Sequence, residues 1–327
     1  MKRALIVGID HYNNQALTTC ETDAKKVSEL LERNGDGSKN FDTKLVLSAE
    51  KITRESLLAD IKQLFASPAE VALLYYAGHG FVEPETTAGY LITPDCETEG
   101  HGVALGDIVT LASQGHHKNG IKSTVIILDC CQSGSAAELQ GFSSSVLGQG
   151  MTILTATDRN QSAATDGHHG LFSRILIDAL DSAAADIRGF ITPASVYSHV
   201  DQTLGAWEQR PVYKANVREF SALRRVKPKV PDEVLSQLPK WFITKDYEYP
   251  LNPSFEPEIK EGTETDYPDE IRVKNQAIFA QMQLCNRYGL IEPVEAEHMY
   301  FAAINSKSCK LTALGQYYRN LVLKNII

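Results

Sequence analysis

The sequence lacks an uninterrupted apolar run of the roughly 20 residues that a membrane-spanning helix needs. The short apolar stretch after Met1 is cut by Asp10 and His11, too early for a secretory signal peptide. Cysteine is also scarce, with six among 327 residues and no pair in the Cys-x-x-Cys spacing of a zinc site. These absences exclude a disulfide-built secreted scaffold and predict a cytoplasmic protein with reduced thiols and no membrane contact.

An excess of positive charge is absent as well. The net charge is −9, which argues against a protein whose main role is to coat nucleic acid. The length is sufficient for a large apolar core and a second module. We therefore expect two domains.

Short apolar runs alternate with amphipathic segments over residues 1–225. Strands are predicted over residues 4–9, 43–47, 71–76, 90–93, 125–128, 151–155 and 212–220. Helices are predicted over residues 23–33, 105–113, 171–180 and 193–204, with a further helix capped by Thr53. This alternation predicts an α/β fold with a mostly parallel sheet and helices on both faces.

Two predicted strands end in chemically reactive residues. Residues 125–128 are followed by Asp129, Cys130 and Cys131, and residues 71–76 lead into a Gly-His-Gly segment centred on His79. Ligands of open α/β sheets bind at the carboxyl ends of the strands. A lone cysteine is more often a small buried hydrophobe, but a thiolate formed beside an imidazole attacks amide carbonyls.

Six segments in order resemble caspase-like cysteine peptidases, and the metacaspase branch most closely. They are ALIVGID, TCETDA, YYAGHG, YLITPD, LDCCQSG and GLFSRILIDAL, within residues 2–223. His79 lies about 50 residues before Cys131, as the histidine of caspases does. The caspase signature around the cysteine is absent, because residues 131–134 carry one extra residue, as metacaspase-type sequences do. The resemblance implies a caspase-like α/β/α sandwich and an endopeptidase that need not share the caspase preference for Asp.

The resemblance also implies catalytic roles. Cys131 is the expected nucleophile, and His79 is the expected base that later protonates the leaving amine. The backbone N–H groups of Gly80 and Cys131 are the expected oxyanion donors. No third catalytic residue is assigned. Cys130 is expected in the core, because adjacent strand residues point to opposite faces.

The primary specificity pocket is expected to contain Asp129, Asp23 and Cys20, the positions that line it in metacaspase-type sequences. As an alternative, the two carboxylates are ordinary charges at a strand end and a helix start. Two neighbouring carboxylates repel each other unless a cation joins them, and a guanidinium binds a carboxylate bidentately. The pocket therefore predicts cleavage after Arg or Lys.

Further polar positions carry weaker predictions. Asp95, Asp107 and Glu138 lie where some relatives bind calcium, although ordinary surface charge is the favoured explanation for them. Calcium is thus considered as an activator, and no cofactor is expected for the chemistry. The histidine pairs at residues 116–117 and 168–169 are predicted to be solvated.

The composition changes after residue 225. Residues 226–270 carry seven prolines and many carboxylates, which predicts an acidic linker. Residues 271–327 predict a helix over 271–288, strands over 290–294 and 299–304, and a helix over 311–323. This order resembles the later half of a winged-helix domain. Because the module is only mildly basic, a regulatory protein partner is favoured over DNA.

Two functions are compatible with these features. The first is a cysteine endopeptidase with a Cys131–His79 dyad, in a bacterial stress or defence pathway by family analogy. The alternative is a catalytically silent scaffold whose winged-helix-like module binds a protein or DNA. An intact His79–Cys131 pair favours the peptidase.

Overall fold

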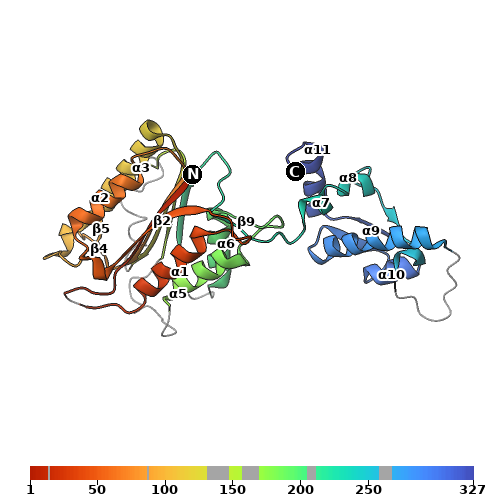
Figure 1. Ribbon diagram of the computed structural model, residues 1–327, viewed down its shortest axis with the longest axis horizontal. Coiled ribbons are helices and arrows are strands. Elements are labelled where there is room, and N and C mark those ends of the chain that lie inside the picture. The colour runs from red at the N-terminus through yellow and green to blue at the C-terminus, as the bar shows by residue number, and fades with distance from the viewer. Residues whose placement is uncertain (14, 87, 131–146, 157–168, 205–210, 258–266) are drawn as a thin grey trace. The chain divides into compact units, whose positions relative to one another are not determined.

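A computed structural model describes residues 1–13, 15–86, 88–130, 147–156, 169–204, 211–257 and 267–327 (Figure 1). These residues form two compact units, Met1–Lys227 and Pro228–Ile327. In the described part of the chain, no helix combines the length and the apolar character required to cross a membrane.

A six-stranded sheet is the centre of the first unit. Its strands are ordered β10-β8-β7-β3-β1-β2, with the bounds Val212–Asn216, Met151–Thr155, Ile121–Cys130, Ala69–Gly78, Lys2–Gly8 and Phe41–Leu47. All neighbours are parallel except β10, which is antiparallel to β8. The prediction of a mostly parallel sheet is thereby confirmed.

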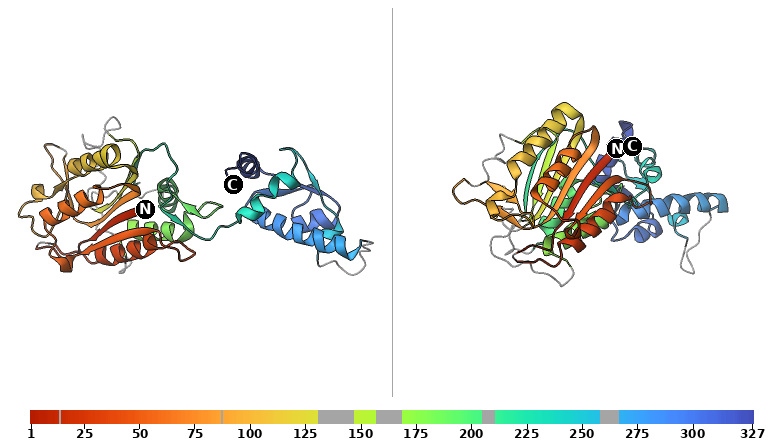
Figure 2. Two further views of the ribbon diagram at one scale, coloured as in Figure 1. Left: turned by 45° about the horizontal axis from the view of Figure 1, so that its top comes forward. Right: turned by 60° about the vertical axis from the view of Figure 1, so that its left-hand side comes forward.

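Helices cover both faces of this sheet (Figures 1 and 2). Helices α2 (Arg54–Leu64) and α3 (Leu105–Asn119) pack on one face. Helices α1 (Cys20–Glu32), α5 (Leu171–Asp178) and α6 (Pro193–Thr203) pack on the other. Side chains of β3 alternate between the two cores, with Tyr76 in the first and Tyr75 in the second. A strand buried on both faces must be apolar throughout, which explains its continuous hydrophobic run.

Smaller elements complete the first unit. Strands β4 (Gly80–Val82), β5 (Gly89–Leu91) and β6 (Val103–Ala104) form an antiparallel sheet directly after β3. A π-helical turn, Ala179–Ala183, continues α5, and β9 (Phe190–Ile191) pairs with β11 (Arg224–Arg225). The predicted cap of α2 is confirmed, since the Thr53 side chain accepts from the N–H of Ser56.

The second unit combines helices with a three-stranded antiparallel sheet, β12-β14-β13. Its strands are Tyr249–Pro250, Ser308–Leu311 and Ile291–Val294. Its helices are α7 (Asp232–Leu235), α8 (Leu238–Trp241), α9 (Asp269–Arg287), α10 (Met299–Ile304) and α11 (Ala313–Leu323), and η5 (Pro253–Phe255) is a 3-10 turn.

Two predictions for this region differ from the structure. Residues 228–257, predicted as a linker, belong to the second unit, because Leu235, Leu238 and Phe242 are completely buried in it. Residues 258–266 lie outside the described residues. The strand predicted over residues 299–304 is helix α10, because its buried residues, Met299, Ala302 and Ala303, share one helical face.

Candidate active site

Strands β3 and β7 carry the two segments predicted to be catalytic to the same edge of the sheet. Gly78, the last residue of β3, pairs with Cys130, the last residue of β7. His79 and Cys131 are the residues that follow this pair in the chain, and Cys131 itself lies outside the described residues. Cys130 is only 7% exposed and belongs to the core beneath α2 and α3, as predicted.

Hydrogen bonds fix the backbone of His79 on both sides. Its N–H donates to the Tyr12 hydroxyl at 2.9 Å, and its carbonyl oxygen accepts from the N–H of Ile92 at 3.0 Å. The buried Tyr76 hydroxyl lies 2.9 Å from the same carbonyl oxygen. A Cβ at Gly78 would lie 2.8 Å from this hydroxyl and closer still to that of Tyr12. Glycine before His79 is therefore a packing requirement.

The imidazole of His79 has a backbone partner that sequence could not assign. Its Nε2 lies 2.7 Å from the carbonyl oxygen of Gln15. Because a carbonyl oxygen only accepts, Nε2 carries the proton of this bond, and Nδ1 is left as the acceptor of the neutral ring. Gln15 has a φ of 59°, a left-handed conformation that costs a non-glycine residue about 1 kcal/mol or more. Every residue has a carbonyl group, so no residue type signals this contact.

Gly80, the predicted oxyanion donor next to His79, is the first residue of β4 and is half-buried. It pairs with Leu91 of β5. The other predicted donor is the N–H of Cys131, which lies outside the described residues.

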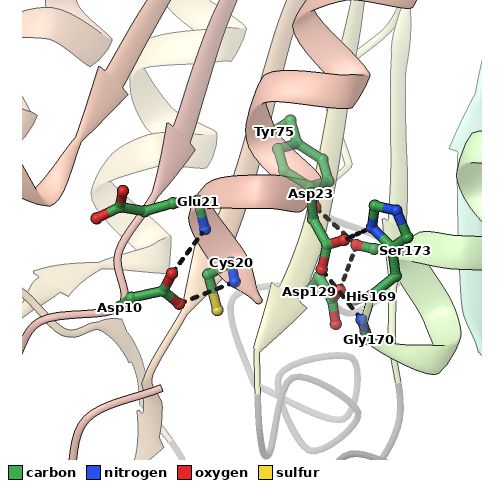
Figure 3. A network of polar contacts seen from close by, with 9 residues as sticks. All are labelled: Asp10, Cys20, Glu21, Asp23, Tyr75, Asp129, His169, Gly170 and Ser173. Carbon is green, nitrogen blue, oxygen red and sulfur yellow. Dashed lines mark hydrogen bonds and ion pairs between the residues drawn. The ribbon is translucent and has the colours of Figure 1, made fainter. Parts of the chain in front are cut away.

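Asp23 lies in the first turn of α1 and is only 1% exposed. Its Oδ1 is 2.5 Å from Nδ1 of His169, and its Oδ2 accepts from the N–H of Gly170 at 3.2 Å (Figure 3). Burial raises the pKa of the Asp23 carboxyl, whereas the bonds to His169 and Gly170 act in the opposite direction. The prediction that the histidine pair at 168–169 is solvated is wrong for His169, and His168 lies outside the described residues.

Asp129, at the end of β7, is half-buried and accepts a short hydrogen bond from the Ser173 hydroxyl on α5. The Ser173 oxygen lies 2.7 Å from the hydroxyl of Tyr75, deep in the core. Burial raises the pKa of Asp129 to about 6; the Ser173 bond lowers it, and the charge of Asp23 raises it further. The carboxyl is therefore harder to ionise than an ordinary aspartate.

The carboxylates of Asp23 and Asp129 both lie close to Gly170. A Cβ placed on Gly170 would be 3.5 Å from Oδ2 of Asp23 and 3.6 Å from Oδ2 of Asp129. Figure 3 shows both carboxylates pointing toward the start of α5. Two charges predicted to share a pocket, and separated by more than 100 positions in the chain, are thus close neighbours in the fold.

Cys20, the third residue predicted for the pocket, begins α1. Its backbone N–H donates to Oδ1 of Asp10 at 2.9 Å, and the next N–H, of Glu21, donates to Oδ2 at 3.2 Å (Figure 3). Burial, followed by the charges of Asp10, Asp129 and Asp23, raises the pKa of the Cys20 thiol. This thiol is therefore a poor nucleophile.

Two of the three predicted calcium residues, Asp95 and Asp107, lie in the described part of the chain. Both oxygens of Asp95 accept from the N–H of Arg54, and the Thr93 hydroxyl also donates to Oδ1. Asp107 is exposed on α3, and Glu138 lies outside the described residues. Among the residues that are described, no three His, Cys, Asp or Glu side chains form a group suited to a metal ion.

Sequence reasoning missed Asp10, His169 and Ser173. The segment GLFSRILIDAL contains Gly170 and Ser173, so the resemblance marked this region without giving it a role. His169 and Asp23 are 146 positions apart, and only the docking of α5 beside α1 brings them together.

Comparison with known proteins completes the description of the site. The structure of protein GSU0716 from Geobacter sulfurreducens is 16% identical with a TM-score of 0.46, covering 69% of this chain and 97% of that chain. Pro-sf-caspase-1 is 12% identical with a TM-score of 0.48, and the match covers 68% of this chain and 90% of that chain. Caspase-1 from Spodoptera frugiperda is 13% identical with a TM-score of 0.48, and the match covers 69% of this chain and 90% of that chain. No curated protein matches the sequence. The family model of the caspase domain matches residues 1–231, a span that includes His79 and Cys131, and the chain therefore belongs to the caspase domain family.

Proposed function

We propose that this protein is a metacaspase-type cysteine endopeptidase that cleaves protein substrates after Arg or Lys. The family consists of cysteine peptidases. The proposal is supported most directly by the position of His79, which is fixed by hydrogen bonds directly after Gly78. Gly78 pairs with Cys130 on the neighbouring strand, and Cys130 immediately precedes Cys131.

The catalytic steps follow from the hydrogen bonds of His79. Nδ1 of the neutral ring takes the proton of the Cys131 thiol, and the thiolate attacks the carbonyl carbon of the substrate. The N–H groups of Gly80 and Cys131 stabilise the oxyanion. His79 then gives its proton to the leaving amine, and water hydrolyses the thioester. The Gln15 carbonyl keeps its bond to Nε2–H throughout and stabilises the imidazolium.

Specificity for a basic residue rests on the neighbouring carboxylates of Asp23 and Asp129, with Cys20 beside them. A substrate carboxylate would be repelled there, whereas a guanidinium or ammonium group would be attracted by both carboxylates. The preference for Arg or Lys over Asp is thus an electrostatic consequence of two residues.

The C-terminal module, residues 271–327, is proposed to recognise a regulatory protein partner in the manner of a winged-helix-like domain. Its seven basic and three acidic residues give it too little positive charge to favour nucleic acid. A role in bacterial stress or defence is proposed by family analogy alone. Calcium is proposed only as an activator, since the dyad chemistry itself uses no metal.

The decisive test is hydrolysis of fluorogenic peptides that differ at the residue before the scissile bond, assayed with and without calcium. Cys131→Ala should abolish hydrolysis, and His79→Ala should reduce it about 10²–10⁴-fold because positioned proton transfer is lost. Cys130→Ala is the matched control and should retain most activity, since its side chain lies in the core. An active Cys131→Ala protein would refute the mechanism. A folded wild-type protein that cleaves no peptide would support the silent scaffold instead.

A further inference from the structure

The imidazole of His169 is the more exposed partner of a buried carboxylate. The His169 side chain is 25% exposed and that of Asp23 is 1% exposed. The 2.5 Å separation between Nδ1 and Oδ1 is short for a hydrogen bond between nitrogen and oxygen. In the described structure, therefore, the Asp23 carboxylate, which is proposed to bind the cationic side chain of the substrate, is already hydrogen-bonded to His169.

A substrate guanidinium needs carboxylate oxygens with lone pairs available. Oδ1 of Asp23 is used by His169, Oδ2 of Asp23 by the N–H of Gly170, and Oδ2 of Asp129 by the Ser173 hydroxyl. Asp23 is thus bonded at both oxygens before any substrate is present.

These bonds differ in how readily they can be exchanged. Gly170 is the N-cap residue of α5, and its carbonyl accepts from the N–H of Arg174 at 2.8 Å, so its own N–H is fixed by the helix. Ser173 is completely buried and lies within hydrogen-bond distance of Tyr75. His169 precedes the helix, so a change of its side-chain rotamer can exchange the bond to Asp23 while the backbone of α5 stays in place.

We propose that His169 is a specificity-determining gate: its imidazole holds Asp23 in the substrate-free protein, and the basic side chain of the substrate replaces it as the donor to Asp23. The proposal rests on the proposed function, because it takes Asp23 and Asp129 as the residues that receive the substrate cation. The exchange leaves Asp23 paired before and after binding, so the cost of a buried unpaired carboxylate is avoided. It also predicts that a neutral side chain, which cannot compensate the charge, does not open the gate efficiently.

Steady-state kinetics distinguish a His169 that competes with the substrate for Asp23 from a His169 that only stabilises the pocket. The substrates are two peptides that differ only in arginine or citrulline, its neutral analogue, before the scissile bond. His169→Ala should lower KM for the arginine peptide roughly 3- to 10-fold, because the hydrogen bond from His169 no longer competes with the substrate for Asp23. A change of this size corresponds to the free energy of one hydrogen bond. The KM for the citrulline peptide should fall as well, because the neutral side chain no longer meets an imidazole that it cannot displace. His169→Gln, which keeps an N–H donor, should stay near wild type. An unchanged or higher KM for arginine in a folded His169→Ala protein would overturn the gate.

A binding measurement on the wild-type protein tests the same exchange without catalysis. The probe is agmatine, a guanidinium compound that is not a peptide, and the readout is the strongly deshielded Nδ1 proton of His169 in spectra of protein with 15N-labelled histidine. The signal is assigned by its loss in His169→Gln, and it should disappear as agmatine saturates the protein. Binding of agmatine with the proton retained would overturn the gate alone. A protein that binds no agmatine, with or without His169, has no pocket for a basic side chain, which would overturn the gate and the proposed specificity together.

Discussion

Asp129 is a carboxyl group whose raised pKa brings its loss of charge closer to neutral pH. Burial raises its pKa from 3.8 to about 6, and the neighbouring charge of Asp23 contributes to the increase. A raised carboxyl pKa means that the proton is bound more tightly in the folded protein, so the negative charge is lost as the pH falls through about 6. An ordinary aspartate would keep its charge over this range.

Selectivity for arginine over citrulline should therefore depend on pH. We expect the ratio of kcat/KM for the two peptides to fall about 10-fold or more between pH 7.5 and pH 5, because one charged hydrogen bond is lost. Asp129→Asn should have the lower ratio at every pH and a much flatter profile. Asp107→Asn removes an exposed carboxylate on α3 and should leave the profile unchanged. A wild-type ratio that is independent of pH would show that Asp129 does not bind the substrate cation.

At the scale of single residues, some residues of the site are predictable from the sequence and others are not, and the reasons are physical. Asp23 and Asp129 lie in motifs that the resemblance aligns, so the sequence assigns both to the pocket without information on their proximity in the fold. Gln15 acts through its carbonyl oxygen, which every residue possesses. His169 looked like a loop histidine because its partner lies in another helix, and side-chain contacts over such separations leave no local pattern.

At the scale of elements, the start of α1 depends on a residue outside the helix. Its N-cap residue, Thr19, makes no capping bond with its side chain, and Asp10, two residues after β1, accepts from the first two N–H groups instead. Asp10 is only 8% exposed. A buried carboxylate bonded to a helix N-terminus satisfies free N–H groups and interacts favourably with the helix dipole.

Asp10→Ala should lower the free energy of unfolding by about 1–2 kcal/mol, the usual worth of an N-cap with charged hydrogen bonds. It should also weaken the preference for arginine, because Cys20 and Asp23 lie in the same first turn. Thr53→Ala, which removes the cap of α2 on the opposite face of the sheet, is the matched control. It should cost about 1 kcal/mol in urea denaturation without changing the preference. Equal effects of both variants on specificity would refute a special role of Asp10.

The regular elements of the first unit were largely predictable because their burial is regular. Continuous apolar runs marked the strands covered on both faces, and the run over residues 151–155 coincides with β8. The six residues of α10 show the limit of this approach, since a short apolar run fits a strand or a helix equally well. Only the surrounding packing decides between them.

At the scale of the whole molecule, the boundary between the units lies at Lys227–Pro228, close to the composition change after residue 225. The segment that follows was misread as a linker because its apolar anchors have no period. Leu235, Leu238, Phe242, Leu251 and Phe255 are all buried, but turns and prolines separate them. Composition alone cannot distinguish such a segment from a disordered one.

A protein that ends at Lys227 should fold and cleave short peptides. The first unit contains the complete sheet, both helical layers and the residues proposed for catalysis. We expect kcat/KM for a short arginine peptide to lie within a few-fold of the full chain, with a cooperative thermal transition as the control for folding. A truncated protein that folds but is inactive would show that the second unit contributes to the catalytic centre.

Self-processing should occur at the boundary between the units and not inside the catalytic domain. The sequence from Cys131 to Asp158 contains neither Lys nor Arg, so an enzyme with a basic preference has no site there. Arg224, Arg225, Lys227 and Lys229 lie at the boundary, and the last three are exposed. Of these, Arg225 lies within β11 and Lys227 precedes a proline, which favours cleavage after Lys229.

Incubation of the wild-type protein followed by N-terminal sequencing of the fragments should give new termini between residues 225 and 230. The Cys131→Ala protein should remain intact under the same conditions, which separates self-cleavage from a contaminating protease. Lys229→Gln should slow the release of the second unit while peptide hydrolysis continues, because cutting at the boundary is not required for activity. A new terminus between residues 132 and 158 would refute both the basic preference and activity without internal cleavage.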